Sequence, residues 1–549
     1  MRKAGITAAV ICFLLSACHS EPVDFLTRKV DEKLFSYEIS LRMENASIAE
    51  VKISDFKTEY DKNREAVAYF EEAIVNSQYI NVDSYAGATK TSESIKSNLL
   101  EMLDEMKIDR DHFINKSKLD DLEVNEEVYD EVIVGAGLSG LTAAARMAQQ
   151  GKNVVVVEKM PFAGGAGYLS GGEMSVPMLD KQSADPVNAF YKDMMEGSNH
   201  TGDPHKLFRI ASGMDEVYTW LKEDVGIEFH EEPYEVQGHS APRIDLPKQL
   251  GKGLIDGLVK ECEKNGVTIL YNVEALSLID EEGKVTGINT LSNKNEIINI
   301  YSEDKVILAT GGFAYNKILL GKYNKQWDHL DKLTTTVPEG STGDGIIMAQ
   351  NIGADVVDMD KIQLFPFTNP ATGVNHYIEG NRTVLGAIFV NKEGERFVDE
   401  HANREVLATE FLKQTDQTVY QIFNHELLLK TMSFSKARKT YEEEYDQGVL
   451  FTADTLEDLC HKAGIGQAFI EDYDCEGPYY AIVGTPSIHY TMGGLKTSLQ
   501  AEVLDVHGKV IPGLYAIGET TGGTFGENRL GATSIPDGLV NGYLIAENR

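Results

Sequence analysis

The N-terminal part of the chain alternates hydrophobic and polar positions from Ser36 to Phe56, with a break at Glu44-Asn45-Ala46. This period of two predicts two antiparallel strands joined by a hairpin turn. Helical periodicity follows over about 63–76 and again over 92–106. These elements form a small α+β unit, residues 24–108. The acidic stretch that follows, residues 109–127, has little apolar content and predicts a solvated linker.

A second pattern begins with the short apolar strand 131–134 and continues into a helix, 141–150, and a second strand, 153–157. The turn between the first strand and the helix carries Gly135, Gly137 and Gly140 in a GxGxxG spacing. This arrangement predicts a dinucleotide site, in which the first glycine makes the turn, the second admits the pyrophosphate and the third packs helix on strand. Glu158 ends the second strand, where an acid accepts hydrogen bonds from a ribose.

Length and charge limit the classes of function. A chain of 549 residues exceeds the size of one hydrophobic core, so several domains are expected. The formal net charge of −35 repels phosphate backbones, and nucleic acid is not an expected partner. An anionic substrate must therefore be held by arginines placed at the site itself.

The first residues predict export and anchoring. The apolar run from Ala4 to Ala17 is too short to span a membrane and is typical of a secretory signal. Leu15-Ser16-Ala17-Cys18 resembles a bacterial lipobox, which implies a signal over residues 1–18, lipidation of Cys18 and an extracytoplasmic, lipid-anchored protein. The alternative is an ordinary signal with a chance cysteine.

The other cysteines do not indicate a disulfide framework. Without Cys12 of the signal and the lipidated Cys18, three remain, at wide spacing: Cys262, Cys460 and Cys475. The sequence has no CxxCH for an attached haem and no CxxC pair for zinc or an iron–sulfur cluster, so no metal site is expected.

Residues 83–89, Asp-Ser-Tyr-Ala-Gly-Ala-Thr, resemble the flavinylation motif of FMN-binding domains. The resemblance implies that Thr89 carries FMN through a phosphoester, and that a flavin transferase attaches it. The small residues before Thr89 leave room for a phosphate, and the following helix start offers free N–H groups. The alternative is a Gly-Ala turn that caps a helix.

Four motifs in this order resemble those of the fumarate reductase and succinate dehydrogenase flavoproteins. They are the GxGxxG unit, the glycine-rich stretch 159–172, the strand and ATGG turn 306–312, and the segment 511–519. The resemblance covers roughly three quarters of the chain and implies an α/β fold. We expect a Rossmann-type FAD-binding domain in two parts, 128–359 and 487–549, an inserted α+β capping domain, 360–486, and the small FMN-binding domain before them.

The resemblance implies non-covalent FAD. Its expected binding residues are Gly135, Gly137, Gly140, Glu158, Lys159, Gly165, Gly172, Ala309, Thr310, Gly311, Asp344, Glu519, Ser534 and Ile535.

The same resemblance implies the reaction residues. Arg404, after the stretch 395–400, matches the arginine that gives a proton to the substrate, and Glu379 and Arg382 match the relay that reprotonates it. Arg529, in the segment Gly526 to Gly531, matches the arginine that grips a substrate carboxylate through its planar fork. Taken singly, Arg404 could be a surface helix residue, and Glu379 with Arg382 a helical ion pair.

The chain departs from fumarate reductases at three substrate positions. Phe365 and Tyr490 replace two histidines, with His489 just before the second, and Ile378 stands where a threonine is usual. The segment 369–377 is about one residue longer than in fumarate enzymes, which leaves open that His376 enters the site. With Phe365 and Ile378 in place of polar residues, a buried second carboxylate of the substrate would lack partners, at a cost of several kcal/mol.

These observations predict an extracytoplasmic reductase of an α,β-unsaturated monocarboxylate, with an apolar or aryl substituent on the double bond. Electrons would come from a membrane donor through FMN to FAD. The alternatives are a fumarate reductase, a ketosteroid-type flavin dehydrogenase, and an electron-transfer lipoprotein without a substrate. The absent histidines weigh against the first, Arg529 against the second, and the retained arginine pair against the third.

Overall fold

The computed structural model of the chain describes residues 24–31, 35–44, 47–58, 67, 70–71, 74–75, 80, 89–106, 108, 124–230, 232–294, 296–373, 386–431, 445, 447–473 and 475–547. The chain divides into two compact units, Met1–Asn125 with Ser292–Ile297, and Glu126–Leu291 with Ile298–Arg549. No helix in the described ranges is long and apolar enough to cross a membrane.

The first unit is an antiparallel sheet covered by a helix. Its strands β1 (Asp24–Asp31), β2 (Phe35–Glu44) and β3 (Ser47–Thr58) lie in the order β1-β2-β3, and α2 (Thr89–Glu105) contacts β2. Alternate residues of β2 such as Ile39 and Leu41 are fully buried, as the period of two predicted. The sequence pattern missed β1, which Arg28 ties to α2 by an ion pair to Glu101 of 2.6 Å. The hairpin turn at 45–46 and most of the predicted helix 63–76 lie outside the described residues.

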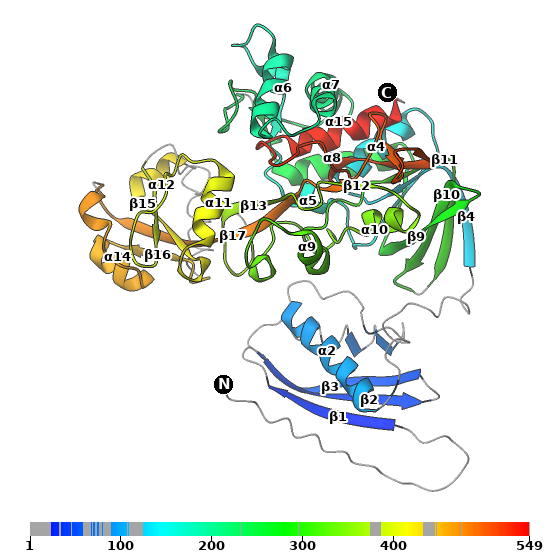
Figure 1. Ribbon diagram of the computed structural model, residues 1–549, viewed down its shortest axis with the longest axis horizontal. Coiled ribbons are helices and arrows are strands. Elements are labelled where there is room, and N and C mark those ends of the chain that lie inside the picture. The colour runs from blue at the N-terminus through cyan, green and yellow to red at the C-terminus, as the bar shows by residue number, and fades with distance from the viewer. Residues whose placement is uncertain are drawn as a thin grey trace. The chain divides into compact units, whose positions relative to one another are not determined.

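The second unit is built on an eight-stranded sheet (Figure 1). Its main path is β19-β20-β11-β4-β5-β8, and β10 pairs with β11 and β9. The pairs β4 with β5, β5 with β8 and β11 with β20 are parallel, as a Rossmann-type fold requires. The strands are β4 (Val124–Val134), β5 (Val154–Glu158), β8 (Thr268–Tyr271), β9 (Val273–Glu281), β10 (Lys284–Ser292), β11 (Ile297–Leu308), β19 (Glu502–Leu504) and β20 (Val510–Ala516).

Helices from distant parts of the chain pack together beside this sheet. The buried helix α4 packs on α8 and on α15, and α15 also packs on α7. The α-helices of this part are α4 (Leu138–Gln149), α5 (Gly165–Leu169), α6 (Pro186–Gly197), α7 (Pro204–Glu223), α8 (Leu250–Lys264), α9 (Lys317–Tyr323), α10 (Asp344–Asn351) and α15 (Ser534–Ala546). Short elements join them: β6 (Met174–Ser175), β7 (Ile244–Asp245), β12 (Val356–Val357), β18 (Gly494–Leu495), η1 (Pro177–Leu179), η2 (Leu330–Lys332) and η6 (Gly518–Thr520).

A second sheet forms the capping region of the same unit, with the order β13-β17-β15-β14 and β16 paired to β17. Its long strand β17 runs from this sheet toward the part of the unit that holds the eight-stranded sheet (Figure 1). The strand ends at Thr491, past the predicted end of the capping domain at 486. Aromatic side chains, among them Phe367, Phe389 and Phe411, form its core. The elements are β13 (Ile362–Thr368), β14 (Ile388–Asn391), α11 (Arg404–Leu412), η4 (Thr415–Gln417), β15 (Val419–Asn424), α12 (His425–Thr431), β16 (Leu450–Ala453), α14 (Leu456–Ala463), η5 (Ile470–Asp472) and β17 (Tyr479–Thr491).

Candidate functional site

One cavity of about 1540 Å³ runs from the glycine loop after β4 to the edge of the capping sheet. Drug-sized ligands occupy pockets of roughly 300–1,000 Å³, so this cavity has room for a dinucleotide and a small substrate together. Most of the predicted cofactor residues line it: Gly135, Gly137, Glu158, Lys159, Gly165, Ala309, Thr310, Gly311, Asp344, Glu519, Ser534 and Ile535.

The three glycines of the loop have the geometry that a pyrophosphate site needs. A Cβ on Gly135, whose φ is +106°, would lie 2.4 Å from the Ala309 carbonyl, and one on Gly140 would lie 2.0 Å from the Gly135 carbonyl. A Cβ on Gly137 would meet nothing within 4 Å. The first and third glycines are thus required by packing, and the second faces the open space where the diphosphate of a dinucleotide would approach.

Two acidic residues are held at fixed places beside this loop. The Glu158 carboxylate accepts backbone hydrogen bonds from Ala136 and Met160, both 2.8 Å long, which fixes it at the end of β5. Lys159 forms a 2.6 Å ion pair with Asp344, the first residue of α10. Two predicted residues lie outside the cavity lining, since Gly140 packs on the loop and Gly172 packs on the backbone at Leu250 and Gly251.

Glu519 lies half-buried in the cavity lining and bonds Thr491 near the substrate end. Its Oε1 accepts hydrogen bonds from the Thr491 amide at 2.9 Å and the Thr491 hydroxyl at 3.1 Å. Burial raises the pKa of Glu519 to about 7, although the bonds from Thr491 favour the ionised form. A side chain on Gly312 would collide with both groups, so the ATGG turn must present a bare backbone here.

At the substrate end, Arg529 is 4% exposed and faces the cavity. Its guanidinium donates to the Gln363 side-chain oxygen at 2.9 Å and lies 4.7 Å over the centre of the Tyr490 ring. Its buried Nε has no hydrogen-bond partner in the described structure. Burial lowers the pKa of Arg529, and an anion placed beside it would restore the charge interaction that water no longer supplies.

Arg404 reaches the same cavity from the first turn of α11, which is capped by the Asn403 side chain. Its guanidinium carbon lies 4.8 Å over the centre of the Phe365 ring. Phe365 and Tyr490 are therefore each paired with one of the two arginines. Aromatic faces attract guanidinium groups, so both rings position a cation at this end of the cavity.

His489 also lines the cavity, because β17 bulges beside β13. Gln363 is opposite Tyr490 but Leu364 is opposite Ile488, so His489 is the extra residue. A bulge can direct two consecutive side chains to one face, and both His489 and Tyr490 face the cavity. The imidazole Nδ1 makes a 2.7 Å hydrogen bond with the Thr336 hydroxyl. Burial, followed by the charges of Arg404 and Arg529, lowers the pKa of His489 well below 6.5.

Three of the predicted residues, Ile378, Glu379 and Arg382, lie outside the described residues, as does His376. The predictions that concern them stay open. Sequence reasoning also missed residues that serve the site. Gln363 joins Arg529 to Asn528, to whose Oδ1 it donates at 2.8 Å, and Thr336 orients His489. Gln363 stands two residues before Phe365, but its hydrogen bond with Arg529 joins residues 166 positions apart in the chain.

Comparison with known proteins agrees with this geometry. Residues 130–535 match the family described as FAD binding domain. A urocanate reductase of Eggerthella lenta is 33% identical over 92% of this chain and 88% of its own length. An NADH:fumarate oxidoreductase of Klebsiella pneumoniae is 28% identical, and the match covers 92% of this chain but 56% of that protein. The solved structure of a flavocytochrome c3 fumarate reductase in an open conformation has a TM-score of 0.66 at 28% identity, over 77% of this chain and 78% of that one.

The chain therefore belongs to the FAD binding domain family, within the flavoproteins of the fumarate reductase and succinate dehydrogenase type. It is an FAD-dependent oxidoreductase of the group that acts on CH–CH bonds.

Proposed function

We propose that this protein reduces the double bond of an α,β-unsaturated monocarboxylic acid whose β-carbon carries an apolar or aryl group. The observation that carries the proposal is the pairing of each arginine with an aromatic ring at the substrate end of the cavity. Arg529 supplies a fixed cationic fork for one carboxylate. Phe365, which is 8% exposed, stands where fumarate reductases have a histidine to bind a second carboxylate.

His489 does not restore the missing charge. Burial and the charges of Arg404 and Arg529 lower the pKa of His489, which favours the neutral imidazole. Since Nδ1 is already bonded to the Thr336 hydroxyl, a neutral ring offers a second carboxylate at most one hydrogen bond, from Nε2. A second carboxylate would have to give up its water for that single bond, which is unfavourable in a buried site. An uncharged β-substituent loses less hydration free energy when it enters the cavity. The name of the Eggerthella lenta relative, a urocanate reductase, supports a monocarboxylic substrate class.

The roles of the residues follow from this placement. FAD, once bound and reduced by the electron donor, would supply the hydride that adds to the β-carbon and would itself be reoxidised. Arg529 holds the carboxylate, and Arg404 gives a proton to the α-carbon, so that hydride and proton together saturate the double bond. Arginine is a weak acid, with an ordinary pKa above ~12, so the proton must be replaced at once. Glu379 and Arg382 are proposed for that replacement.

We propose also that electrons enter through FMN joined to Thr89, with a membrane donor and a flavin transferase as partners. The support is the motif at 83–89 and the first residue of α2, which is Thr89. The matches to the two relatives cover 92% of the chain, more than the FAD binding domain alone. The lipid anchor at Cys18, and with it an extracytoplasmic location, rests on the lipobox resemblance.

Substrate-dependent reoxidation tests the proposal. The protein is reduced anaerobically with a viologen donor, and enoates are added one at a time. We expect reoxidation by a β-substituted acrylate in wild type, and a fall in kcat of roughly 10² to 10⁴ in Arg404→Ala, the range for loss of a positioned acid. Absence of reoxidation by every enoate would contradict the function, and near-normal kcat in Arg404→Ala would remove that residue from the reaction.

A further inference from the structure

A short loop outside the recognised motifs touches the chain segments of both substrate arginines. We call residues 236–240 the strap. On one side, the His239 imidazole bonds the Gly531 carbonyl at 3.0 Å, two residues after Arg529. Because a carbonyl only accepts, His239 carries its proton on Nε2 and donates it to this bond. Burial lowers the pKa of His239, which favours this neutral form.

On the other side, the Gln237 side-chain amide donates to the carbonyl of His401. His401 lies three residues before Arg404, in the turn that leads into α11. Gln237 thus joins the strap to the capping region, whereas His239 joins it to the C-terminal segment of the flavin part. The two bonds come from residues only two positions apart, so the strap fixes the spacing between the segments that carry Arg404 and Arg529.

Close packing reinforces the first of these bonds. Gly238 has a φ of +92°, and a Cβ there would lie 2.7 Å from Leu530 Cδ1. A Cβ on Gly531 would lie 3.4 Å from Val236 Cγ1. Gly238 therefore packs closely against the Leu530 side chain, whereas Gly531 lies near Val236 with room for one more carbon atom. A shift of Gly238 displaces Leu530.

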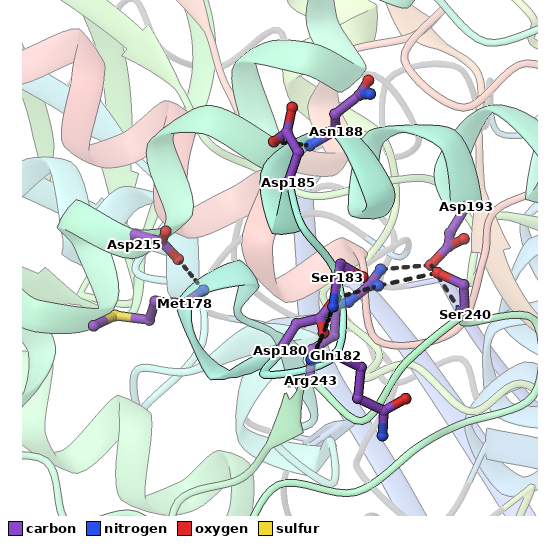
Figure 2. A network of polar contacts seen from close by, with 10 residues as sticks. All are labelled: Met178, Asp180, Gln182, Ser183, Asp185, Asn188, Asp193, Asp215, Ser240 and Arg243. Atoms are coloured by element: carbon purple, nitrogen blue, oxygen red, sulfur yellow. Dashed lines mark hydrogen bonds and ion pairs between the residues drawn. The ribbon is translucent and has the colours of Figure 1, made fainter.

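The strap is anchored by a buried ionic network (Figure 2). Arg243 is fully buried and bonds Asp180 at 3.0 Å and also Asp193. The Asp193 carboxylate accepts from the backbone amide and the hydroxyl of Ser240, both at 2.9 Å, and so holds the last strap residue. Asp180 in turn accepts the amides of Gln182 and Ser183. Ions this deeply buried tolerate little movement, because each displacement leaves a charge unpaired.

We infer that the strap is a positioning device for catalysis: His239 orients Arg529 through the Gly531 carbonyl, and Gln237 orients Arg404 through the His401 carbonyl. The inference rests on the proposed function for the chemical roles of the two arginines. Its structural content, that Gln237 and His239 each hold one arginine segment, stands on the two bonds alone.

Matched variants separate the hydrogen bond from the bulk of each side chain. In His239→Gln the amide nitrogen takes the place of Nε2 and can still donate to Gly531, whereas in His239→Asn the side chain is too short. Gln237→Glu keeps the shape but presents only acceptors to the His401 carbonyl. The exposed His205, at the start of α7, provides the control variant His205→Asn.

Hydrogen–deuterium exchange of the flavin-loaded protein measures how firmly the strap holds each arginine segment, and it needs no substrate. We expect exchange in peptides covering 529–533 to be at least about threefold faster in His239→Asn, with peptides covering 401–406 unchanged, since loss of one hydrogen bond favours local opening. Gln237→Glu reverses the pattern. His239→Gln and His205→Asn match wild type.

Steady-state kinetics with a β-substituted acrylate give the second readout. His239→Asn is expected to raise KM about tenfold with kcat within about threefold, because Arg529 binds substrate and transition state alike. Gln237→Glu is expected to lower kcat about fivefold with KM within about twofold, because Arg404 acts in the transition state. His239→Gln restores wild-type KM.

The two readouts separate failure of the inference from failure of the proposed function. The strap inference is overturned if His239→Asn and Gln237→Glu leave exchange unchanged in both peptides. It is also overturned if either variant changes exchange equally in the peptides covering 401–406 and 529–533. The selective exchange pattern without enoate turnover in wild type retains the strap and contradicts the enoate reductase. The selective pattern with turnover but without the expected division between KM and kcat removes the strap from catalysis.

Discussion

The Arg404 guanidinium lies over the ring of Phe365, with 4.8 Å between its central carbon and the ring centre. Phe365 also meets His489, whose ring centre is 5.3 Å away. Phe365 therefore helps to position Arg404, the proposed acid, and also lines the cavity with an apolar surface. A residue that looks like a lost ligand in the sequence has a positive role in the structure.

Phe365→Leu should lower kcat for an acrylate by about 5- to 30-fold, because a desolvated guanidinium over an aromatic ring gains ~1–2 kcal/mol. Phe365→Tyr keeps the ring and should stay within about twofold of wild type. The control is Phe397→Leu, which removes a ring that packs on Phe411 in the capping core. Equal losses in Phe365→Leu and Phe397→Leu would show that the effect is on packing and not on Arg404.

His489 should make the protein less stable at acid pH. Its pKa is lowered in the folded state, mainly by burial, so the unfolded chain binds a proton first as the pH falls below 6.5. Proton binding by the unfolded chain favours unfolding, and this contribution to stability is lost on the acid side. The Tm of wild type, relative to that of His489→Gln, should therefore fall as the pH is lowered from 7.5 to ~5. His507→Gln, at an exposed site, is the control, and a difference for His489→Gln that is independent of pH would contradict a neutral buried imidazole.

Arg243→Met should destabilise the protein strongly. Removal of one partner from a buried ionic network leaves the carboxylates of Asp180 and Asp193 unpaired, at a cost of roughly 3–5 kcal/mol. Lys248→Met breaks an exposed pair with Glu228 and should cost less than about 1 kcal/mol. Urea unfolding followed by flavin fluorescence and circular dichroism measures both. Similar losses in the two variants would show that the Arg243 network contributes no more than a surface pair.

Thr89→Ala should abolish covalent flavin, because the threonine hydroxyl is the proposed attachment point. Acid precipitation is expected to release about one FAD per wild-type chain while FMN stays with the polypeptide. Viologen-driven turnover, which bypasses FMN, should survive the change. Ser97→Ala, at an exposed position of the same helix α2, should keep its covalent flavin. FMN that remains bound to denatured Thr89→Ala protein would show that the motif was misread.

The parts of the fold that could be predicted are those encoded within a few neighbouring residues. The glycine loop identified the dinucleotide site, because the φ of +106° at Gly135 and the contact of Gly140 with the Gly135 carbonyl arise within the loop itself. Arg404 and Arg529 could be proposed from short motifs. The contacts that position them could not, since the Gln363 bond to Arg529 and the His239 bond to Gly531 join residues far apart in the chain. The bulge at His489 depends on pairing with β13 and has no signature within β17.

The ratio of kcat/KM for two substrates shows whether this pocket accepts one carboxylate and an uncharged β-substituent. A cinnamate-like or simple acrylate substrate and fumarate are compared with one enzyme preparation, one viologen donor and one pH. Desolvation of the second carboxylate beside Phe365 and the neutral His489 predicts a preference for the acrylate of at least about tenfold, or ~1.4 kcal/mol. Turnover of fumarate that equals or exceeds that of the acrylate would show that the pocket accepts a second carboxylate beside Phe365.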